Sequence, residues 1–309
     1  MHLMEDNMEY RIEDIHYTVN KVNCGHETIL CCLDNQNYNK IDLCELYFIA
    51  NPNTMKRISN TNNFGYNDLS DVISNINKNT NFNIKRIINE NNSEKILEEI
   101  KKNSLVLLYV KASMLIYQKI RVVKYPFHMV IANGFDTSNN TIHIIDTFEN
   151  DDLGISAKEH DLDMDFVLNH TVEYCVFERK REKTLQILNY RCIEENIKMA
   201  SQNDELGLFY NINSYFKFLE TINMEVRADN LAAFRWIVTG SFFYNLIRYV
   251  QYNKESKYDL INLQELQKKW DIMLRKYIKD CFRKSNQCLY EKHEIAELIV
   301  ETQNKISKI

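Results

Sequence analysis

The sequence predicts an α+β protein whose strands belong to its first part and whose last part is all-helical. Short helical and strand-like patterns alternate up to residue 178, and one pair of β-rich segments is joined by a polar turn. From residue 179 the chain carries long helical patterns and little strand-like alternation. We therefore expect an α+β domain over 1–178 and a helical domain over 179–309, with the charged run RKREK at the boundary.

Four helices are expected before the first strand. The first, over 24–35 (CGHETILCCLDN), has its apolar residues at helical spacing and runs into an asparagine-rich turn. The same periodicity predicts helices over 42–50, 68–77 and 94–102, and Ser93 is placed to cap the last of them.

The strand signals follow. Residues 104–110 (SLVLLYV) form a continuous apolar run of strand length. The segments 128–135 (HMVIANGF) and 141–148 (TIHIIDTF), joined by DTSNN, predict a β-hairpin, and 171–178 (TVEYCVFE) predicts one more strand that closes the sheet. We expect this sheet to be antiparallel.

The second part of the chain carries five helical patterns. They cover 184–203, 211–224, 230–252, 262–284 and 290–308. We read their many aromatic residues as the core of a helical domain.

Composition excludes several classes of protein. A formal net charge of −5 argues against a nucleic-acid-binding surface spread over the whole protein. The first 20 residues hold no apolar signal segment, and no stretch approaches the ~18 apolar residues of a membrane span. The 8 cysteines include no C-x-x-C pair, so we expect reduced thiols in the cytoplasm and no metal site. No phosphate loop or nucleotide fingerprint occurs, which implies no ATP.

Cys24 is the first candidate for chemistry, because it opens a predicted helix. The first-turn N–H groups and the helix dipole stabilise a thiolate there, and the same N–H groups can hold an oxyanion. Position alone favours an ordinary packing cysteine, however, since a thiol nucleophile also needs a base and an orienting partner.

The hairpin supplies candidates for both partners. His128 stands at the start of one strand and Asp146 near the end of the other. Counted inward from the turn, Phe135 faces Thr141 and His128 faces Phe148, so Asp146 is a diagonal neighbour of His128 on the same face. Taken singly, His128 is better explained as a strand-end polar residue and Asp146 as a turn initiator.

The remaining histidines are weaker candidates. A helix would point His26 away from Cys24, and His143 alternates with two isoleucines. No partner pattern accompanies His16, His160, His170 or His293.

The order Cys24, His128, Asp146, with the cysteine opening a helix and the other two on a hairpin, resembles the papain-like cysteine peptidase superfamily. The segment HMVIANGFDTSNNTIHIIDTF is similar to that family's His strand, turn and Asn or Asp strand. The chain also resembles butirosin-biosynthesis acyltransferases and closthioamide-type amide synthetases. In the butirosin enzymes a helical domain follows the peptidase-like one, and LAAFRWIVTGSFFYNLIRYV (231–250) resembles its aromatic helix.

This resemblance implies an amide-forming acyltransferase of non-ribosomal natural-product biosynthesis. An acyl or peptidyl group would pass from a carrier-protein thioester, through a Cys24 acyl-enzyme, to a small amine such as a diamine. His128 would act as the base and Asp146 would orient it. The implied partners are the carrier protein and the amine, with no cofactor besides the phosphopantetheine that the carrier brings.

One position departs from the papain-like pattern. Those peptidases carry a Gln about six residues before the cysteine as an oxyanion donor, and here that position is Thr18. Asn23 is a candidate side-chain donor, although a helix cap is the simpler role for it. The missing Gln counts against an ordinary peptidase more than against transfer from a reactive thioester.

Two alternatives stay open. A papain-like cysteine peptidase or amidase would use the same three residues on peptide substrates without a carrier protein. A non-catalytic binding module would keep the fold with a degenerate site, and its Cys24 would then react as an ordinary thiol.

Overall fold

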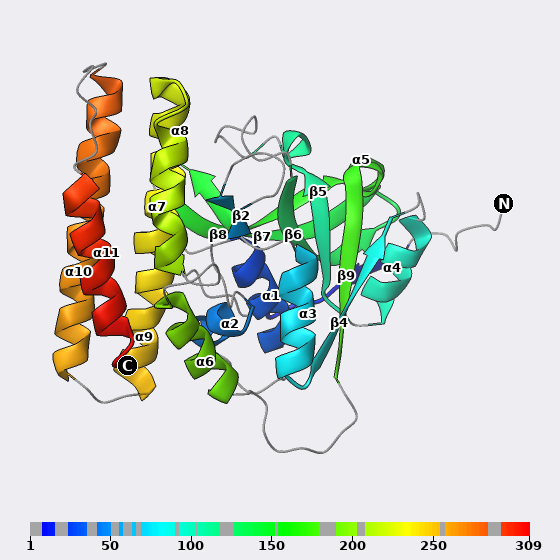
Figure 1. Ribbon diagram of the computed structural model, residues 1–309. Coiled ribbons are helices and arrows are strands. Elements are labelled where there is room, and N and C mark those ends of the chain that lie inside the picture. The colour runs from blue at the N-terminus through cyan, green and yellow to red at the C-terminus, as the bar shows by residue number, and fades with distance from the viewer. Residues whose placement is uncertain are drawn as a thin grey trace. The chain divides into compact units, whose positions relative to one another are not determined.

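The protein is α+β with a mostly antiparallel sheet, as the computed structural model shows (Figure 1). The structure describes residues 8–15, 24–35, 42–50, 56–57, 64–65, 69–89, 93–102, 104–115, 117, 127–151, 154–179, 190–202, 208–253, 257–283 and 292–309. Every strand pair among these residues is antiparallel, which confirms that expectation.

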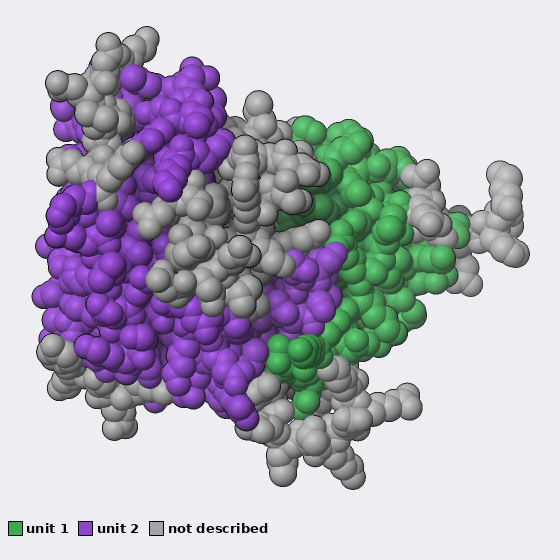
Figure 2. Space-filling model, viewed as in Figure 1, with its two compact units in different colours: residues 1–43, 76–187 green, residues 44–75, 188–309 purple. Residues whose placement is uncertain are grey.

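By their internal contacts the residues form two compact units (Figure 2). Unit 1 joins Met1–Leu43 to Ile76–Ile187, and unit 2 joins Cys44–Asn75 to Leu188–Ile309. The division predicted at 178/179 differs for residues 44–75, because the second helix packs among the later helices. There Phe48 meets the rings of Phe242 and Tyr249 edge-on.

Unit 1 is built on a sheet whose strands lie in the order β4-β9-β5-β6-β7-β8, with β1 also paired to β6. Their bounds are β1 Glu9–Arg11, β4 Phe82–Ile88, β5 Val106–Lys111, β6 Phe127–Asp136, β7 Thr141–Asp151, β8 Gly154–Asp163 and β9 Thr171–Arg179. A separate two-stranded pair holds β2 Lys56–Arg57 and β3 Phe64–Gly65. The predicted strands correspond to β5, β6, β7 and β9.

The helices predicted in the first part are all present. They are α1 Cys24–Asn35, α2 Leu43–Ala50, α3 Leu69–Asn79 and α4 Ser93–Lys101, followed by the 3₁₀ turn η1 Ala112–Met114 and the helix α5 Met164–His170. The sequence patterns did not predict α5, which is short, or strands β1, β2, β3, β4 and β8. Strand β8 (GISAKEHDLD) is mostly polar, so hydrophobic alternation could not reveal it.

Different helices pack on the two faces of the sheet. Helices α4 and α5 contribute Ile96, Ile100 and Val167 to an apolar cluster with alternate residues of β5, β6 and β7. Helix α1 packs on the same three strands, and Ile131 and the other intervening residues point away from that cluster. The alternation along each strand therefore determines whether a side chain faces α4 and α5 or faces α1.

An extra residue in β6 sets the register of the hairpin. Near the turn Phe135 pairs with Ile142, so the predicted pairing with Thr141 was wrong by one residue. The register shifts between Ala132 and Gly134, leaving Asn133 as a β-bulge. Beyond it Ile131 pairs with Ile145, which is the register that the prediction assumed for this part of the hairpin.

Hydrogen bonds from the segment that follows strand β1 stabilise the bulge. The amide of Ile12 donates to the carbonyl of Asn133 over 2.8 Å, and the Asn133 amide group donates back to the Ile12 carbonyl over 3.3 Å. β5 pairs with β6 up to Ala132, and β1 takes over from Gly134, so the bulge lies where the partner strand changes.

Unit 2 buries an aromatic core among its helices, as expected. Trp270 is fully buried against Phe209 and Phe234. The helices are α6 Tyr190–Ala200, α7 Leu208–Leu219, α8 Met224–Arg235, the π-helical η2 Trp236–Phe242, α9 Phe243–Asn253, α10 Lys257–Phe282 and α11 Lys292–Ile306. The single helix predicted over 230–252 thus contains a π-helical segment. Within the described ranges, no helix has the length and apolar character needed to span a bilayer.

Gly134 is required by the close approach of β1. A Cβ at this position would lie 2.4 Å from the Tyr10 carbonyl oxygen and 2.8 Å from the Arg11 Cα. We predict that Gly134→Ala separates β1 from β6, destabilises the fold by about 1–3 kcal/mol, and speeds hydrogen exchange at the Ile12 amide. Urea unfolding and amide exchange measure both effects.

Gly240→Ala is the matched control, since its Cβ would meet only the Trp236 ring, at 3.3 Å and beyond. Exchange at Ile12 that is unchanged in Gly134→Ala would contradict the steric role given to this glycine.

Candidate active site

The predicted cysteine stands where a helix begins. Helix α1 starts at Cys24, as expected. The structure describes the backbone of Cys24, while its side chain, Asn23 and Thr18 lie outside the described residues. The oxyanion role considered for Asn23 therefore stays a prediction.

His128 and Asp146 are brought together as predicted. The His128 Nε2 atom lies 2.9 Å from Asp146 Oδ1 and 3.0 Å from Oδ2. The Asp146 side chain is fully buried and that of His128 is 14% exposed. Because a carboxylate only accepts, Nε2 carries the donated proton, and Nδ1 of a neutral imidazole is then the atom that can take a proton from a thiol.

This pairing depends on the bulge at Asn133. The register near the turn, which pairs Gly134 with His143, would set position 146 opposite position 131, three residues from position 128 and therefore on the other face. With the bulge, positions 128 and 146 share one face of the sheet.

A second bulge brings a further carboxylate to the same place. In the pairing of β7 with β8, Asp146 lies opposite Lys158 but Glu149 lies opposite Ser156, so β7 holds one extra residue between them. Residues three apart on a regular strand point to opposite faces. The extra residue allows Asp146 and Glu149 to enter one network.

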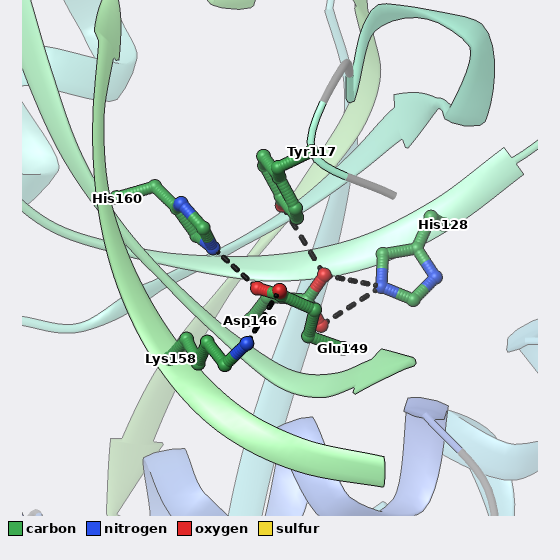
Figure 3. A network of polar contacts seen from close by, with 6 residues as sticks. All are labelled: Tyr117, His128, Asp146, Glu149, Lys158 and His160. Atoms are coloured by element: carbon green, nitrogen blue, oxygen red, sulfur yellow. Dashed lines mark hydrogen bonds and ion pairs between the residues drawn. The ribbon is translucent and has the colours of Figure 1, made fainter. Parts of the chain in front are cut away.

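Figure 3 shows this network, which joins two histidine–carboxylate pairs through Tyr117. The Tyr117 hydroxyl donates to Asp146 Oδ2 over 3.2 Å, and its ring stacks on His160 with centroids 3.7 Å apart. His160 Nε2 lies 2.5 Å from Glu149 Oε2, and Lys158 Nζ donates to Glu149 Oε1 over 3.0 Å. Burial, and next the Asp146 carboxylate, raise the pKa of Tyr117 far above its ordinary value.

Helix α1 is tied to β7 beside Asp146. The hydroxyl oxygens of Thr28 and Thr147 lie 3.0 Å apart in a hydrogen bond, and both residues are fully buried. Position 24 lies one helical turn before Thr28, and Thr147 directly follows Asp146. This bond therefore fixes the start of α1 relative to the strand that carries Asp146, the candidate orienting carboxylate.

Three other cysteine thiols of unit 1 are poor nucleophiles at neutral pH. Burial raises the pKa of Cys31 and of Cys175 to about 12, and burial raises that of Cys32 as well. A thiol that stays protonated at neutral pH is a poor nucleophile. These cysteines serve as packing residues, as the sequence led us to expect for most of them.

The sequence did not point to Tyr117, Glu149, Lys158 or His160. The sequence analysis found no partner pattern for His160, but the structure pairs it with Glu149. Glu149 lies on β7, and His160 lies on β8, a strand that was not predicted. Every-second spacing of Lys158 and His160 was the available signal, since it puts both on one face of a strand. His170 and His293 also have partners: Nδ1 of His170 bonds the Phe166 carbonyl, and Nδ1 of His293 faces Glu297.

No cluster of three or more His, Cys, Asp or Glu residues that could hold a metal ion occurs in the part of the chain that the structure describes. In comparisons with known proteins, neither the family models nor the curated protein sequences contain a match to this chain. The function proposed below therefore rests on the geometry of the site.

The Thr28–Thr147 bond can be tested by a double-mutant cycle. Valine keeps the shape of threonine, so Thr28→Val or Thr147→Val alone leaves the other hydroxyl buried without this partner and costs about 1–3 kcal/mol. The double variant should cost clearly less than the two single changes together. Urea unfolding of the four proteins measures the coupling, and additive free energies would refute the role of this bond.

Proposed function

We propose that this protein is an amide-forming acyltransferase with a papain-like catalytic domain and Cys24 as its nucleophile. One observation carries the proposal: the His128–Asp146 pair leaves Nδ1 of His128 as the proton-accepting atom, in the same unit as a helix that begins at Cys24 and packs on β6 and β7. A thiol, a base and an orienting carboxylate are what acyl transfer through a thioester requires.

In the first half-reaction the Cys24 thiolate attacks the carbonyl carbon of the carrier-protein thioester. A bond forms between Cys24 Sγ and that carbon, and the bond to the phosphopantetheine sulfur breaks. The His128 imidazolium gives its proton to the leaving sulfur, so the carrier departs as a free thiol. One thioester replaces another, and this exchange is nearly neutral in free energy.

In the second half-reaction the amine attacks the Cys24 acyl group. His128 takes a proton from the amine nitrogen as the C–N bond forms and the C–S bond breaks, which regenerates the thiolate and imidazolium. Formation of the amide drives the cycle. Asp146 stabilises the imidazolium in both halves and keeps Nε2 protonated.

A thioester donor suits this chain better than a peptide. Thr18 stands where papain-like peptidases have the Gln that donates to the oxyanion. The backbone N–H groups at the start of α1 are the donors we assign instead. A thioester carbonyl, already more reactive than an amide, needs less of this stabilisation. The phosphopantetheine arrives with the substrate.

The acyl-enzyme is the direct test. We expect intact mass spectrometry to show one added acyl mass on the wild-type protein after incubation with an acyl-loaded carrier protein, and loss of that mass when a diamine is added. Cys24→Ala should show no adduct and no turnover, because the thioester intermediate cannot form.

Cys192→Ala is the matched control, since this partly buried thiol lies outside the site. It should acylate like the wild type. An adduct that persists in Cys24→Ala would refute the assigned nucleophile. Cleavage of peptides without a carrier would replace the proposal by the peptidase alternative.

Thiol reactivity separates an enzyme from a binding module. With iodoacetamide at pH 6–7 we expect rapid labelling of Cys24 and almost none of Cys31, Cys32 or Cys175, whose pKa values burial raises. Labelling of the three buried thiols should increase only at strongly alkaline pH. Peptide mapping measures each site, and a Cys24 that labels only above pH 8 would favour the non-catalytic alternative.

A further inference from the structure

We propose that Tyr117 is a positioning residue that sets the orientation and the charge of Asp146 through its hydroxyl. The inference deepens the proposed function, on which its catalytic meaning rests. Its starting point is that the Asp146 carboxylate accepts from both His128 Nε2 and the Tyr117 hydroxyl.

The geometry gives the two donors different tasks. His128 Nε2 lies within 3.0 Å of both Asp146 oxygens, so this contact alone allows the carboxylate to rotate between them. Tyr117 bonds only Oδ2, at 3.2 Å. The hydroxyl therefore distinguishes the two oxygens and restricts this rotation.

The tyrosine ring is itself held in place. It lies nearly parallel to the His160 ring, with an interplanar angle of 9° and centroids 3.7 Å apart. His160 is anchored by Glu149, which is 5% exposed and also accepts from Lys158. Figure 3 shows that these residues approach Asp146 from the side opposite His128. The second histidine–carboxylate pair thus acts as the support for Tyr117.

The environment keeps Tyr117 a donor. Its hydroxyl lies 3.2 Å from the carboxylate of the fully buried Asp146 side chain, so ionisation would place two negative charges side by side. A neutral phenol donates its one proton to Asp146 and withdraws charge from Oδ2. Less charge on Asp146 means weaker stabilisation of the His128 imidazolium.

The test compares Tyr117→Phe with the wild type by NMR titration of the His128 ring. Phenylalanine keeps the stacked ring and removes only the hydroxyl, so Asp146 should hold more charge and the pH midpoint of His128 should rise. Tyr174→Phe is the control, because it removes a buried hydroxyl from β9, on the other side of β5, and should leave the midpoint unchanged.

A second variant keeps the test valid even where Tyr117→Phe does not fold. A 3-fluorotyrosine introduced at position 117 retains the ring and the hydroxyl but donates more strongly. It should move the His128 midpoint downward, opposite to the change in Tyr117→Phe. A purely structural role would not produce shifts of opposite sign.

Turnover gives the link to the proposed function. In the acyl-transfer assay Tyr117→Phe should lower kcat about 10- to 100-fold, the size expected for one hydrogen bond to a charged group, because a carboxylate that is free to rotate orients His128 less well and this loss outweighs the stronger stabilisation of the imidazolium. KM should be unchanged. Midpoints that coincide with the wild type in both Tyr117 variants would overturn the inference. Shifted midpoints in a protein that never acylates Cys24 would leave the role of Tyr117 standing and refute the proposed function.

Discussion

One extra residue in β6, Asn133, decides which side chains of the central hairpin share a face. A strand alternates strictly, so the insertion of a single residue exchanges the two faces beyond it. His128 lies on one side of the bulge and the turn lies on the other. The bulge is in turn held by reciprocal hydrogen bonds with Ile12, which belongs to a part of the chain more than a hundred residues earlier.

The network around Asp146 shows how a polar site can be built on an apolar sheet face. Two carboxylates buried among hydrophobic strands would cost several kcal/mol if they lacked partners. Among the contacts that the structure describes, Asp146 accepts from His128 and Tyr117, and Glu149 accepts from His160 and Lys158. Because loss of any one donor leaves a buried charge undercompensated, the network resists rearrangement and keeps its members in fixed orientations.

The sequence predicted the elements with strong apolar periodicity and not those without it. Helix α1 and strands β6 and β7 were found because their buried residues recur at the spacing of helix or strand. Strand β8 was not predicted because few of its residues are apolar, and its residues His160 and Lys158 were therefore not predicted to belong to the site. The proximity of His128 and Asp146 was predicted correctly although the pairing of Phe135 was not, since the bulge compensates for a turn one residue shorter than assumed. A local sequence pattern cannot predict a bulge that is stabilised by hydrogen bonds to a strand distant in the sequence.

The parts of the site differ in how much chain must be ordered to bring them together. His128 and Asp146 are 18 residues apart and Glu149 and His160 are 11 apart, whereas Thr28 and Thr147 are 119 apart. Loop-closure entropy grows with the logarithm of this separation, so the α1 contact costs about 1.7 kcal/mol more than the His128 contact before any packing energy is gained. The acid–base half of the site is thus a local product of three consecutive strands. The start of α1, in contrast, is tied to β7 by a contact between residues far apart in the sequence.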